Sequence, residues 1–419
     1  MKFGVFYEVQ LPTPWVPGDH ARMFREALDH VQLADRLGID HMWAVEHHFL
    51  EDHALSSAPE SWLPAAAALT KTIRIGHGIA CLPPGFSHPA RVAERIATLD
   101  LVSNGRVEFG TGESASRMEL EAFGVDPTTK RRAYLEALEQ ICNMMTMSPY
   151  PGFEGEFFRM PCRNVLPKPQ QTPHPPVWVA GKPDVAARHG IGCLGFNVMS
   201  GAMAKAAVAS YYRILQEDCV PIGHAINPNI AVLANFHVHP DATIARARGD
   251  HLKFFGYSIG KYYLEGKVRP GRSAGWDEFV AIRDAFPQLG GDNPTSAIGS
   301  PDEVRAHLRQ LQAAGVDQVM LMHQGGRMPH EWNCESLELF AREIMPEFRD
   351  GEDSRQAAKL ARLEPALAAA MQRKVWMKDL GDDVPVIEPY GTASFIPRPG
   401  DHAGVSDDTR GALGIGPGR

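Results

Sequence analysis

Three consecutive titratable side chains, Glu46, His47 and His48, follow the apolar run 41–45. A strand alternates its faces, so Glu46 and His48 would point one way and His47 the other. A histidine at a strand end can act as a general base, because its pKa lies close to the pH at which most enzymes work. The alternative is a hydrogen-bonded pair of core histidines beside a buried carboxylate. For an isolated His-His pair, the residues alone favour that alternative.

A glycine-rich segment, 110–114, follows another apolar run and contains Gly112, Glu113 and Ser114. Glycines at a strand end let a ligand approach the backbone, whose free N–H groups can bind an anion. The spacing fits neither the Walker loop nor the dinucleotide-binding fingerprint. Taken alone, the segment is better explained as a βα turn that needs positive φ.

Charged residues at two predicted helix starts suggest a phosphate site. Gly181 and Lys182 precede Pro183, which suits the first position of a helix. A helix N-terminus with a nearby lysine suits a phosphate. Arg131 begins another predicted helix and could bind the same group. The pair of arginines at 131–132 is nevertheless more typical of a solvated surface.

Clustered histidines raise the alternative of a metal-dependent barrel hydrolase. His53 follows His47 and His48 closely, and His237 and His239 form an H-x-H pair, so either group could bind zinc. The first predicted strand lacks the histidine pair that barrel amidohydrolases place there. No lysine or aspartate at a later strand end clearly completes the ligands. We therefore expect no metal in the active site.

Polar residues at strand ends are typical of a barrel enzyme, whose active site lies at the carboxyl ends of the strands. Eight short apolar runs alternate here with segments whose apolar residues recur at helical spacing. The runs are residues 3–7, 41–48, 73–82, 106–111, 177–180, 194–199, 230–238 and 316–322. This alternation predicts an α/β fold, a (β/α)8 TIM barrel, with a doubly wound open sheet as the alternative.

Two segments exceed a minimal barrel, which we assign to residues 1–349. Residues 240–297 form an insertion between the seventh and eighth strands that is too long for a plain crossover. Its aromatic residues predict a lid or pocket wall, or equally an extra helix packed on the barrel. Residues 350–419 form a C-terminal extension, an alanine-rich helix followed by a Pro/Gly-rich tail. The tail is expected to act as an arm at a subunit interface or to be partly disordered.

The composition narrows the class of protein. The chain has 419 residues, a formal charge of −8 and a pI near 6.1, which argues against a nucleic-acid partner. No apolar run is long enough to span a membrane. The six cysteines include no C-x-x-C pair, so we expect reduced thiols in a cytoplasmic protein.

Four motifs, in the same order, make the chain similar to the bacterial luciferase-like family of flavin-dependent monooxygenases. They are residues 45–49, 88–94, 99–112 and 167–180. The resemblance implies the (β/α)8 barrel and reduced FMN as a co-substrate, supplied by a separate NAD(P)H-dependent flavin reductase. It implies that O2 adds to the flavin and that a small apolar organic substrate is then oxidised, by hydroxylation or Baeyer–Villiger insertion. It also implies a homodimer.

The resemblance assigns roles to residues near the second and third predicted strands. The family's catalytic histidine falls on His47 and its partner histidine on His48, with Glu46 beside them. The strained peptide next to the flavin ring falls near Gly78 and Ile79. His47 would move a proton during oxygenation, and the aromatic segment 254–263 is well placed in the sequence to exclude water.

The resemblance also assigns phosphate contacts, and here the chain departs from the family. The phosphate-binding arginine falls on Arg131, and backbone contacts fall on Gly181, Lys182 and Pro183. Luciferases carry a reactive cysteine and an arginine after the fourth strand.

At those two positions this chain has Gly112 and Glu113, followed by Ser114. The change removes a thiol and a cation, and Lys182 could restore the charge. We therefore expect a relative of luciferase that does not emit light.

Three other functions stay open beside the monooxygenase and are distinguishable by experiment. One is a dehydrogenase or reductase on the same barrel that transfers hydride with a deazaflavin or FMN and without oxygen. The second is a flavin-binding partner subunit without turnover. The third is the metal hydrolase, which elemental analysis would exclude.

Overall fold

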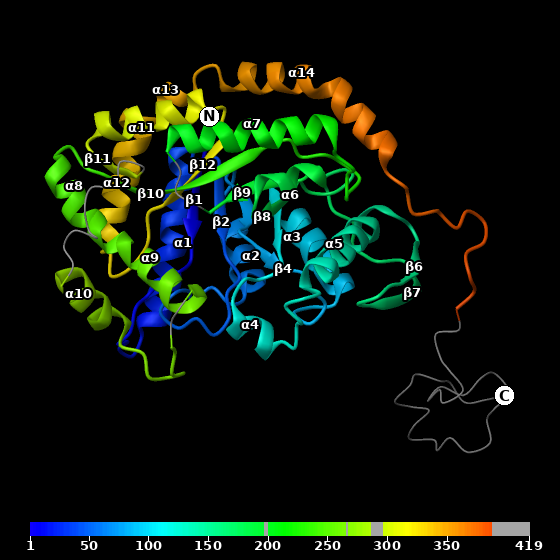
Figure 1. Ribbon diagram of the computed structural model, residues 1–419, viewed down its shortest axis with the longest axis horizontal. Coiled ribbons are helices and arrows are strands. Elements are labelled where there is room, and N and C mark those ends of the chain that lie inside the picture. The colour runs from blue at the N-terminus through cyan, green and yellow to red at the C-terminus, as the bar shows by residue number, and fades with distance from the viewer. Residues whose placement is uncertain (197–199, 265–266, 286–295, 388–419) are drawn as a thin grey trace, which may run out of the picture. The chain divides into compact units, whose positions relative to one another are not determined.

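The strands form a closed barrel in the computed structural model, which describes residues 1–196, 200–264, 267–285 and 296–387 (Figure 1). Each strand pairs in parallel with the next, and the last pairs with the first, so no sheet edge is left open. The barrel strands are β1 (Lys2–Tyr7), β2 (His41–Ala44), β3 (Arg74–His77), β5 (Val107–Gly112), β8 (Val177–Ala180), β9 (Gly192–Gly195), β10 (Ile230–Val238) and β12 (Gln318–Met322). The predicted (β/α)8 barrel is confirmed.

Helices surround the barrel and connect successive strands (Figure 1). The main ones are α1 (Asp19–Leu37), α2 (Pro59–Leu69), α3 (Pro89–Val102), α5 (Lys130–Thr146), α6 (Pro183–Arg188), α7 (Gly201–Glu217), α11 (Pro301–Ala313) and α12 (His330–Glu343). Local signals set their ends. Gly38 closes α1 at φ +79°, and Ser300 and Glu303 form a reciprocal capping box at the start of α11.

Three of the predicted strands differ from their expected limits by more than two residues at one end. The run 41–48 ends as a strand at Ala44, because the chain turns away and the His47 N–H donates to Ser56 O at 3.0 Å. The alternation of faces expected for Glu46, His47 and His48 therefore does not apply. The run 73–82 breaks at Gly78 and Ile79 into β3 and the short β4 (Ala80–Cys81).

The sixth strand starts earlier than predicted, at Gly192, and ends at Gly195. Part of the predicted run, 197–199, lies outside the described residues. The proline-rich connection after α5 contains an antiparallel hairpin, β6 (Tyr150–Glu154) and β7 (Arg159–Arg163), which the sequence analysis missed.

The insertion is mainly helical within its described part. It contains α8 (Ala242–Gly249), η1 (Asp250–Leu252), α9 (Lys253–Ile259), the π-helix η2 (Gly260–Leu264) and α10 (Gly275–Ala285). It ends with β11 (Ala297–Gly299), which extends the pairing of β10. Its role as a lid stays a prediction.

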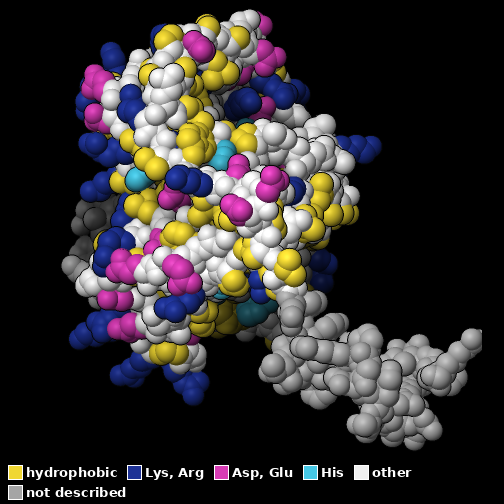
Figure 2. Space-filling view, turned by 90° about the vertical axis from the view of Figure 1, so that its right-hand side faces the viewer, with side chains coloured by type: hydrophobic (Ala, Val, Ile, Leu, Met, Phe, Trp, Pro, Cys, Tyr) yellow, Lys and Arg dark blue, Asp and Glu magenta, His cyan; other side chains and the backbone are white. Residues whose placement is uncertain are grey.

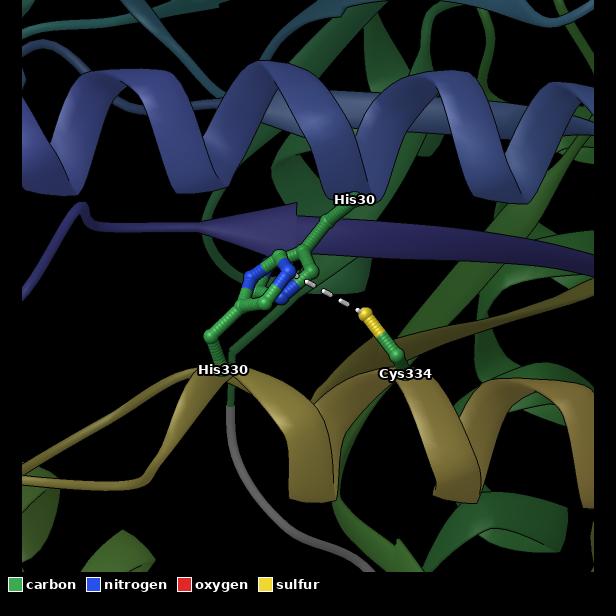
Figure 3. Close-up of side chains that lie close together, drawn as sticks. All are labelled: His30, His330 and Cys334. Atoms are coloured by element: carbon green, nitrogen blue, oxygen red, sulfur yellow. Dashed lines mark hydrogen bonds between the residues drawn. The ribbon is translucent and has the colours of Figure 1, made fainter.

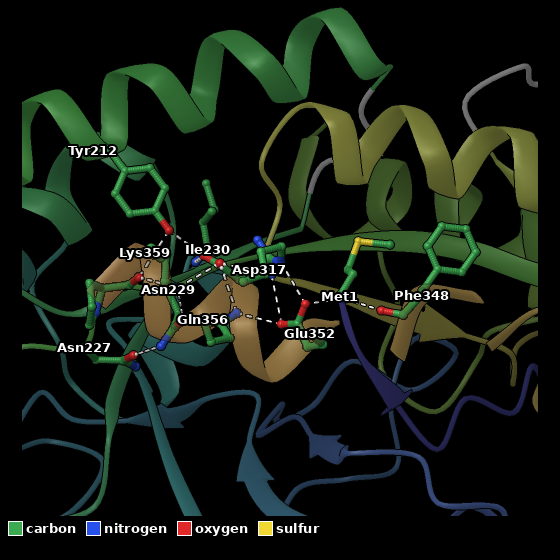
Figure 4. A network of polar contacts seen from close by, with 12 residues as sticks. Met1, Tyr212, Asn227, Asn229, Ile230, Asp317, Phe348, Glu352, Gln356 and Lys359 are labelled. Carbon is green, nitrogen blue, oxygen red and sulfur yellow. Dashed lines mark hydrogen bonds and ion pairs between the residues drawn. The ribbon is translucent and has the colours of Figure 1, made fainter. Parts of the chain in front are cut away.

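The alanine-rich part of the extension packs on the barrel. After α13 (Met345–Arg349), helix α14 (Glu352–Arg373) lies along α7, and one compact unit runs from Met1 to Asp379 (Figure 1). The Lys359 ammonium, on α14, donates to Asp317 Oδ1 at 2.8 Å and Asn229 Oδ1 at 2.7 Å (Figure 4). Asp317 Oδ2 accepts from Tyr212 OH at 2.6 Å and from Ile230 N–H at 3.0 Å. This buried network joins α14 to the amino-terminal ends of β10 and β12, and the arm role of the extension stays a prediction.

Surface charges of both signs are interspersed on the face shown in Figure 2. Lys and Arg side chains alternate there with Asp and Glu, so this face offers nucleic acid no continuous basic patch. None of the helices in the described ranges has both the length and the apolar character needed to cross a membrane.

Candidate active site

A cavity of about 300 Å³ lies at the carboxyl ends of the barrel strands. Seven of the predicted site residues line it, namely Glu46, His47, Gly78, Ile79, Gly112, Glu113 and Ser114. A second, much smaller cavity shares the walls Gly112, Glu113 and Ala180 with the first and reaches Arg131, Gly181 and Lys182. Pro183 follows as the first residue of α6, and His48 does not line either cavity. The structure therefore gathers nearly all predicted residues at one end of the barrel.

Two polar groups lie within hydrogen-bonding distance of one ring nitrogen of His47. Its Nδ1 lies 3.1 Å from Glu119 Oε1 and 3.1 Å from the Tyr263 hydroxyl. Burial lowers the pKa of His47, but the hydrogen bond to Glu119 and the negative charges of Glu8 and Glu119 outweigh it, so the pKa is raised. His47 therefore keeps its proton to higher pH than a free histidine.

Glu119, on the short helix α4 (Arg117–Ala122), is a site residue that the sequence analysis missed. It is fully buried, and it accepts hydrogen bonds from the His48 N–H at 2.8 Å and from the Ser114 hydroxyl. Burial raises its pKa, but the bonds to His47, Ser114 and His48 lower it further than burial raises it. Glu119 is thus a stable carboxylate that fixes the His47 ring.

Glu8, directly after β1, is the second missed residue. Its carboxyl group is buried, and its Oε2 has no hydrogen-bond partner in the described part of the chain. That oxygen lies 3.9 Å from His47 Nε2 and 3.8 Å from His53 Nε2. Burial raises the pKa of Glu8 to about 7, against the lowering effect of His47. Near neutral pH, Glu8 therefore exchanges a proton in the cavity.

Ligand atoms of Glu8, His47 and His53 lie within 4.8 Å of one another, a spacing that would suit a metal hydrolase. The distances of 3.8 and 3.9 Å between Glu8 and the two rings are those of loosely facing groups. His47 is already bound by Glu119, and burial holds the pKa of His53 well below its usual range. These contacts weigh against the metal-hydrolase alternative, and the expectation of no active-site metal stays a prediction.

Glu46 and His48 stabilise the loop that carries His47. Glu46 Oε1 lies 3.1 Å from His48 Nε2, and Glu46 Oε2 accepts from the Cys81 N–H at 3.0 Å. The His48 ring packs edge-on against Phe123 at 4.8 Å. These contacts tie the end of β2 to β4, and the catalytic roles expected for Glu46 and His48 stay predictions.

Aromatic residues of the insertion cover one side of the cavity. Phe255, Ile259 and Tyr263 line it, from α9 and the π-helix. The π-helix carries Tyr263 to within hydrogen-bonding distance of His47, a placement in keeping with the frequent occurrence of π-turns at functional sites.

Asp52 anchors this aromatic cover to the barrel loops. Its carboxylate accepts from the Thr13 N–H at 2.8 Å, from Tyr262 OH at 3.0 Å and from the Lys261 ammonium at 3.1 Å. Burial raises the pKa of Asp52, yet the hydrogen bonds from Ser273 and Thr13 lower it overall. Asp52 therefore stays ionised and connects Thr13 to Lys261, Tyr262 and Ser273 of the insertion.

Backbone strain concentrates at the strand ends around the cavity. Val9, Phe49 and Ser114 have φ of 52°, 65° and 59°, and each directly follows a site residue. A positive φ is unusual for any non-glycine residue and costs about 1–3 kcal/mol where it occurs. Such strain persists only where the surrounding structure imposes it, which is common at active sites.

The small second cavity has cationic side chains that could bind an anion, but it also has a carboxylate on its wall. Arg131 lies on its wall, but Arg131 Nε pairs with Glu113 Oε2 at 2.7 Å. The Lys130 ammonium lies 3.8 Å from Glu113 Oε1. The carboxylate of Glu113 thus pairs with the cations that a phosphate would need. Lys182 is a further cation on the wall.

Comparisons with known proteins show what this chain is similar to. The model of the luciferase-like monooxygenase family matches residues 1–318. The chain is 27% identical over 370 residues to the oxygenase component of a flavin-dependent trigonelline monooxygenase from Acinetobacter baylyi, covering 86% of this chain and 99% of that protein. It is 31% identical over 182 residues to an F420-dependent glucose-6-phosphate dehydrogenase from Amycolatopsis mediterranei, covering 42% of this chain and 54% of that protein.

A solved structure is similar over most of the chain. The monooxygenase RslO1 from Streptomyces bottropensis superposes with a TM-score of 0.67 and 26% identity, over 83% of this chain and 100% of that chain. The family match spans most of the barrel, and the relatives include flavin-dependent monooxygenases. The chain therefore belongs to the luciferase-like monooxygenase family and is an oxidoreductase.

Proposed function

We propose that the protein is the oxygenase component of a two-component monooxygenase that uses reduced FMN and O2. The observation that carries this proposal is the cluster of Glu8, His47 and Glu119 facing an apolar cavity under an aromatic cover. Reduced flavin supplies the two electrons that activate O2. The reduced FMN comes from a separate NAD(P)H-dependent reductase, and the enzyme works as a homodimer in the cytoplasm.

The residues present fit a flavin. The apolar walls formed by Ile79, Phe196 and Phe255 suit a planar ring, and the smaller cavity joins the first through shared walls. Arg131 and Lys182 would hold the phosphate. Glu113 would have to release Arg131 when the phosphate binds, so phosphate binding is expected to be weaker than with an arginine free of a carboxylate.

The chain's own groups then have separate tasks. His47 holds a proton at the cavity edge, and Glu119 fixes its ring through Nδ1. Tyr263 and Phe255 keep water out, which matters because reactive oxygen species in an open site are lost to side reactions. The substrate is a small apolar organic molecule that fits beside the flavin, oxidised by hydroxylation or Baeyer–Villiger insertion.

The F420-dependent relative supports a second candidate, a dehydrogenase that transfers hydride with a deazaflavin and needs no oxygen. The discriminating experiment is anaerobic titration with photoreduced FMN, followed by rapid mixing with oxygenated buffer. Saturable binding and an oxidation trace that differs from that of free reduced FMN support the monooxygenase. Saturable binding of F420 with no binding of reduced FMN supports the dehydrogenase, and FMN binding without altered oxidation supports a subunit without turnover.

The variant His47→Ala tests the role of the histidine in the monooxygenase. It is expected to bind reduced FMN with an affinity close to wild type, because His47 lies away from the phosphate cavity, and to oxidise substrate more slowly. The matched control is His88→Ala, a histidine at the start of α3 that lines neither cavity. A wild-type oxidation rate in His47→Ala would show that His47 has no catalytic role.

A further inference from the structure

A second group of reactive side chains lies outside the active site, between α1 and α12 (Figure 3). His30 comes from α1, while His330 and Cys334 lie one helical turn apart on α12. None of the three lines the active-site cavity. Strands β1 and β12, which precede these two helices, are the pair that closes the barrel, so the group bridges the helices beside that seam.

The spacing of the donor atoms suits a tetrahedral metal ion. One ligand atom from each of His30, His330 and Cys334 can be chosen so that all lie within 4.8 Å of one another. Cys334 Sγ lies 3.6 Å from His330 Nε2. A tetrahedral zinc ion with bonds of about 2.1 Å to nitrogen and 2.3 Å to sulfur would hold such a pair about 3.6 Å apart.

The histidines lack the hydrogen bonds that buried imidazoles normally make. His30 is 1% exposed, and neither of its ring nitrogens has a hydrogen-bond partner within the described ranges. The backbone of His330 lies close enough to act on the pKa of His30, but not in hydrogen-bonding geometry. The Nδ1 of His330 is also buried without a partner there. A buried polar atom left unpaired costs about 1–3 kcal/mol, so these nitrogens call for a ligand.

Nearby acidic side chains favour a cation at this group, and two of its three members are partly exposed. The side chains of Glu338, Glu331 and Asp29 place negative charge near Cys334, partly offset by Arg36. The His30 and His330 rings stack with centroids 4.6 Å apart, so one ring must turn before both can direct a lone pair at the same ion. The side chains of His330 and Cys334 are only partly buried. An ion can therefore reach the group from the surface of α12.

We propose that His30, His330 and Cys334 bind one zinc ion, with a water molecule as the fourth ligand. On binding, the Cys334 S–H bond breaks, its proton passes to solvent, and a sulfur–zinc bond forms without any change of oxidation state. Thiolate and imidazole ligands select a borderline-soft ion such as zinc over magnesium. The ion links α1 to α12 and acts as a structural clamp beside the barrel seam.

Elemental analysis of the full-length protein tests the proposal. After equilibration with zinc chloride and desalting, the wild type is expected to retain about one zinc per chain, and Cys334→Ser and His330→Ala to retain none. Cys162→Ser, which changes a partly buried thiol on β7, and His47→Ala should retain it. Zinc that is lost with His47 and kept in Cys334→Ser would assign the ion to the active-site cavity and overturn the proposal. A wild type that retains no zinc would overturn it too.

Cobalt substitution gives a second readout that does not depend on the stability of one variant. The wild type and Cys162→Ser loaded with Co²⁺ should show a near-ultraviolet thiolate-to-cobalt band, and Cys334→Ser should lack it. Should Cys334→Ser not fold, His330→Ala gives the same test, since the band should weaken when a ligand is lost. Zinc should also raise the melting temperature of the wild type, with no such effect of magnesium. An unchanged band in both variants would refute the assignment, leaving a thiol–imidazole hydrogen bond as the correct description.

Discussion

Replacing Glu119 with Gln should destabilise the protein far more at pH 5.5 than at pH 9. The substitution keeps the side-chain volume and an oxygen that can still accept from His48 N–H, but it removes the charge opposite His47. The pKa of His47 is raised in the folded state, so its contribution is complete below about pH 6.5 and is lost as the pH rises through the folded value. The pKa of Glu119 is lowered, so its contribution is complete above about pH 4.5 and is lost as the pH falls.

The two windows overlap between about pH 4.5 and 6.5, where His47 and Glu119 form a buried ion pair. Breaking such a pair by removing one partner costs about 3–5 kcal/mol. Once the pH has risen through the folded pKa of His47, the ring is neutral, and only the charge-assisted bonds from Ser114 and His48 are lost, at a cost of about 1–2 kcal/mol. Glu8 is protonated at pH 5.5, because its pKa is about 7, so it does not obscure the comparison.

Urea denaturation of both proteins at the two pH values measures the difference. Proton NMR of the His47 ring in the same samples should show its titration shifted to lower pH in Glu119→Gln. The matched control is Glu121→Gln, an exposed residue of the same helix, which should change the free energy of unfolding by less than about 0.5 kcal/mol at either pH. An equal loss of stability at pH 5.5 and pH 9 would refute the ion-pair reasoning.

Three further variants test other contacts. Glu113→Gln should free Arg131 and lower the Kd for reduced FMN several-fold while leaving that for riboflavin unchanged, as measured by anaerobic titration. Asp52→Asn should loosen the insertion and cost about 3 kcal/mol, detectable as faster proteolysis within residues 261–275 and a lower urea midpoint; unchanged proteolysis would show that Asp52 does not anchor it. Lys359→Met should leave Asp317 buried without its ammonium partner and cost about 3 kcal/mol, whereas an unchanged urea midpoint would show that the pair contributes nothing.

The barrel could be predicted from the sequence because each parallel strand is buried on both faces and appears as a short apolar run. The limits of the strands could not be predicted, because tertiary contacts decide where strand pairing stops. The run 41–48 ends as a strand at Ala44, since the backbone beyond it bonds to Ser56. The hairpin β6–β7 was missed because prolines dominate its surroundings, and they argue against a strand.

The site was predictable only where residues at strand ends carried a motif. Glu119 sits three residues after Ser116, the spacing of a capping box, which suggests a structural role at a helix start. In the structure the Ser116 side chain makes no cap, and Glu119 turns to His47 instead. Glu8 ends the first apolar run, but nothing in the sequence indicates that it is buried opposite two histidines.

Glu8 therefore titrates near neutral pH in the cavity, beside His47, whose pKa is also raised. The two carboxyl groups near His47 have pKa values displaced in opposite directions: hydrogen bonds lower that of Glu119, and burial raises that of Glu8. Near neutral pH, Glu119 is therefore a carboxylate, whereas Glu8 can carry a proton. Because the pKa of Glu8 is about 7 in the folded state and about 4.5 when unfolded, its burial costs about 3 kcal/mol of stability well above pH 7.

Glu8→Gln should consequently raise the free energy of unfolding at pH 9 by up to that amount and change it little at pH 4. It should also remove an ionisation near pH 7 from the pH profile of kcat/KM. His47→Ala should lower the rate across the profile and keep that ionisation, moved to higher pH because His47 no longer lowers the pKa of Glu8. A profile that loses this ionisation altogether in His47→Ala and keeps it in Glu8→Gln would reverse the assignment. The roles would then follow the sequence motif, in which only the histidine was expected to move a proton.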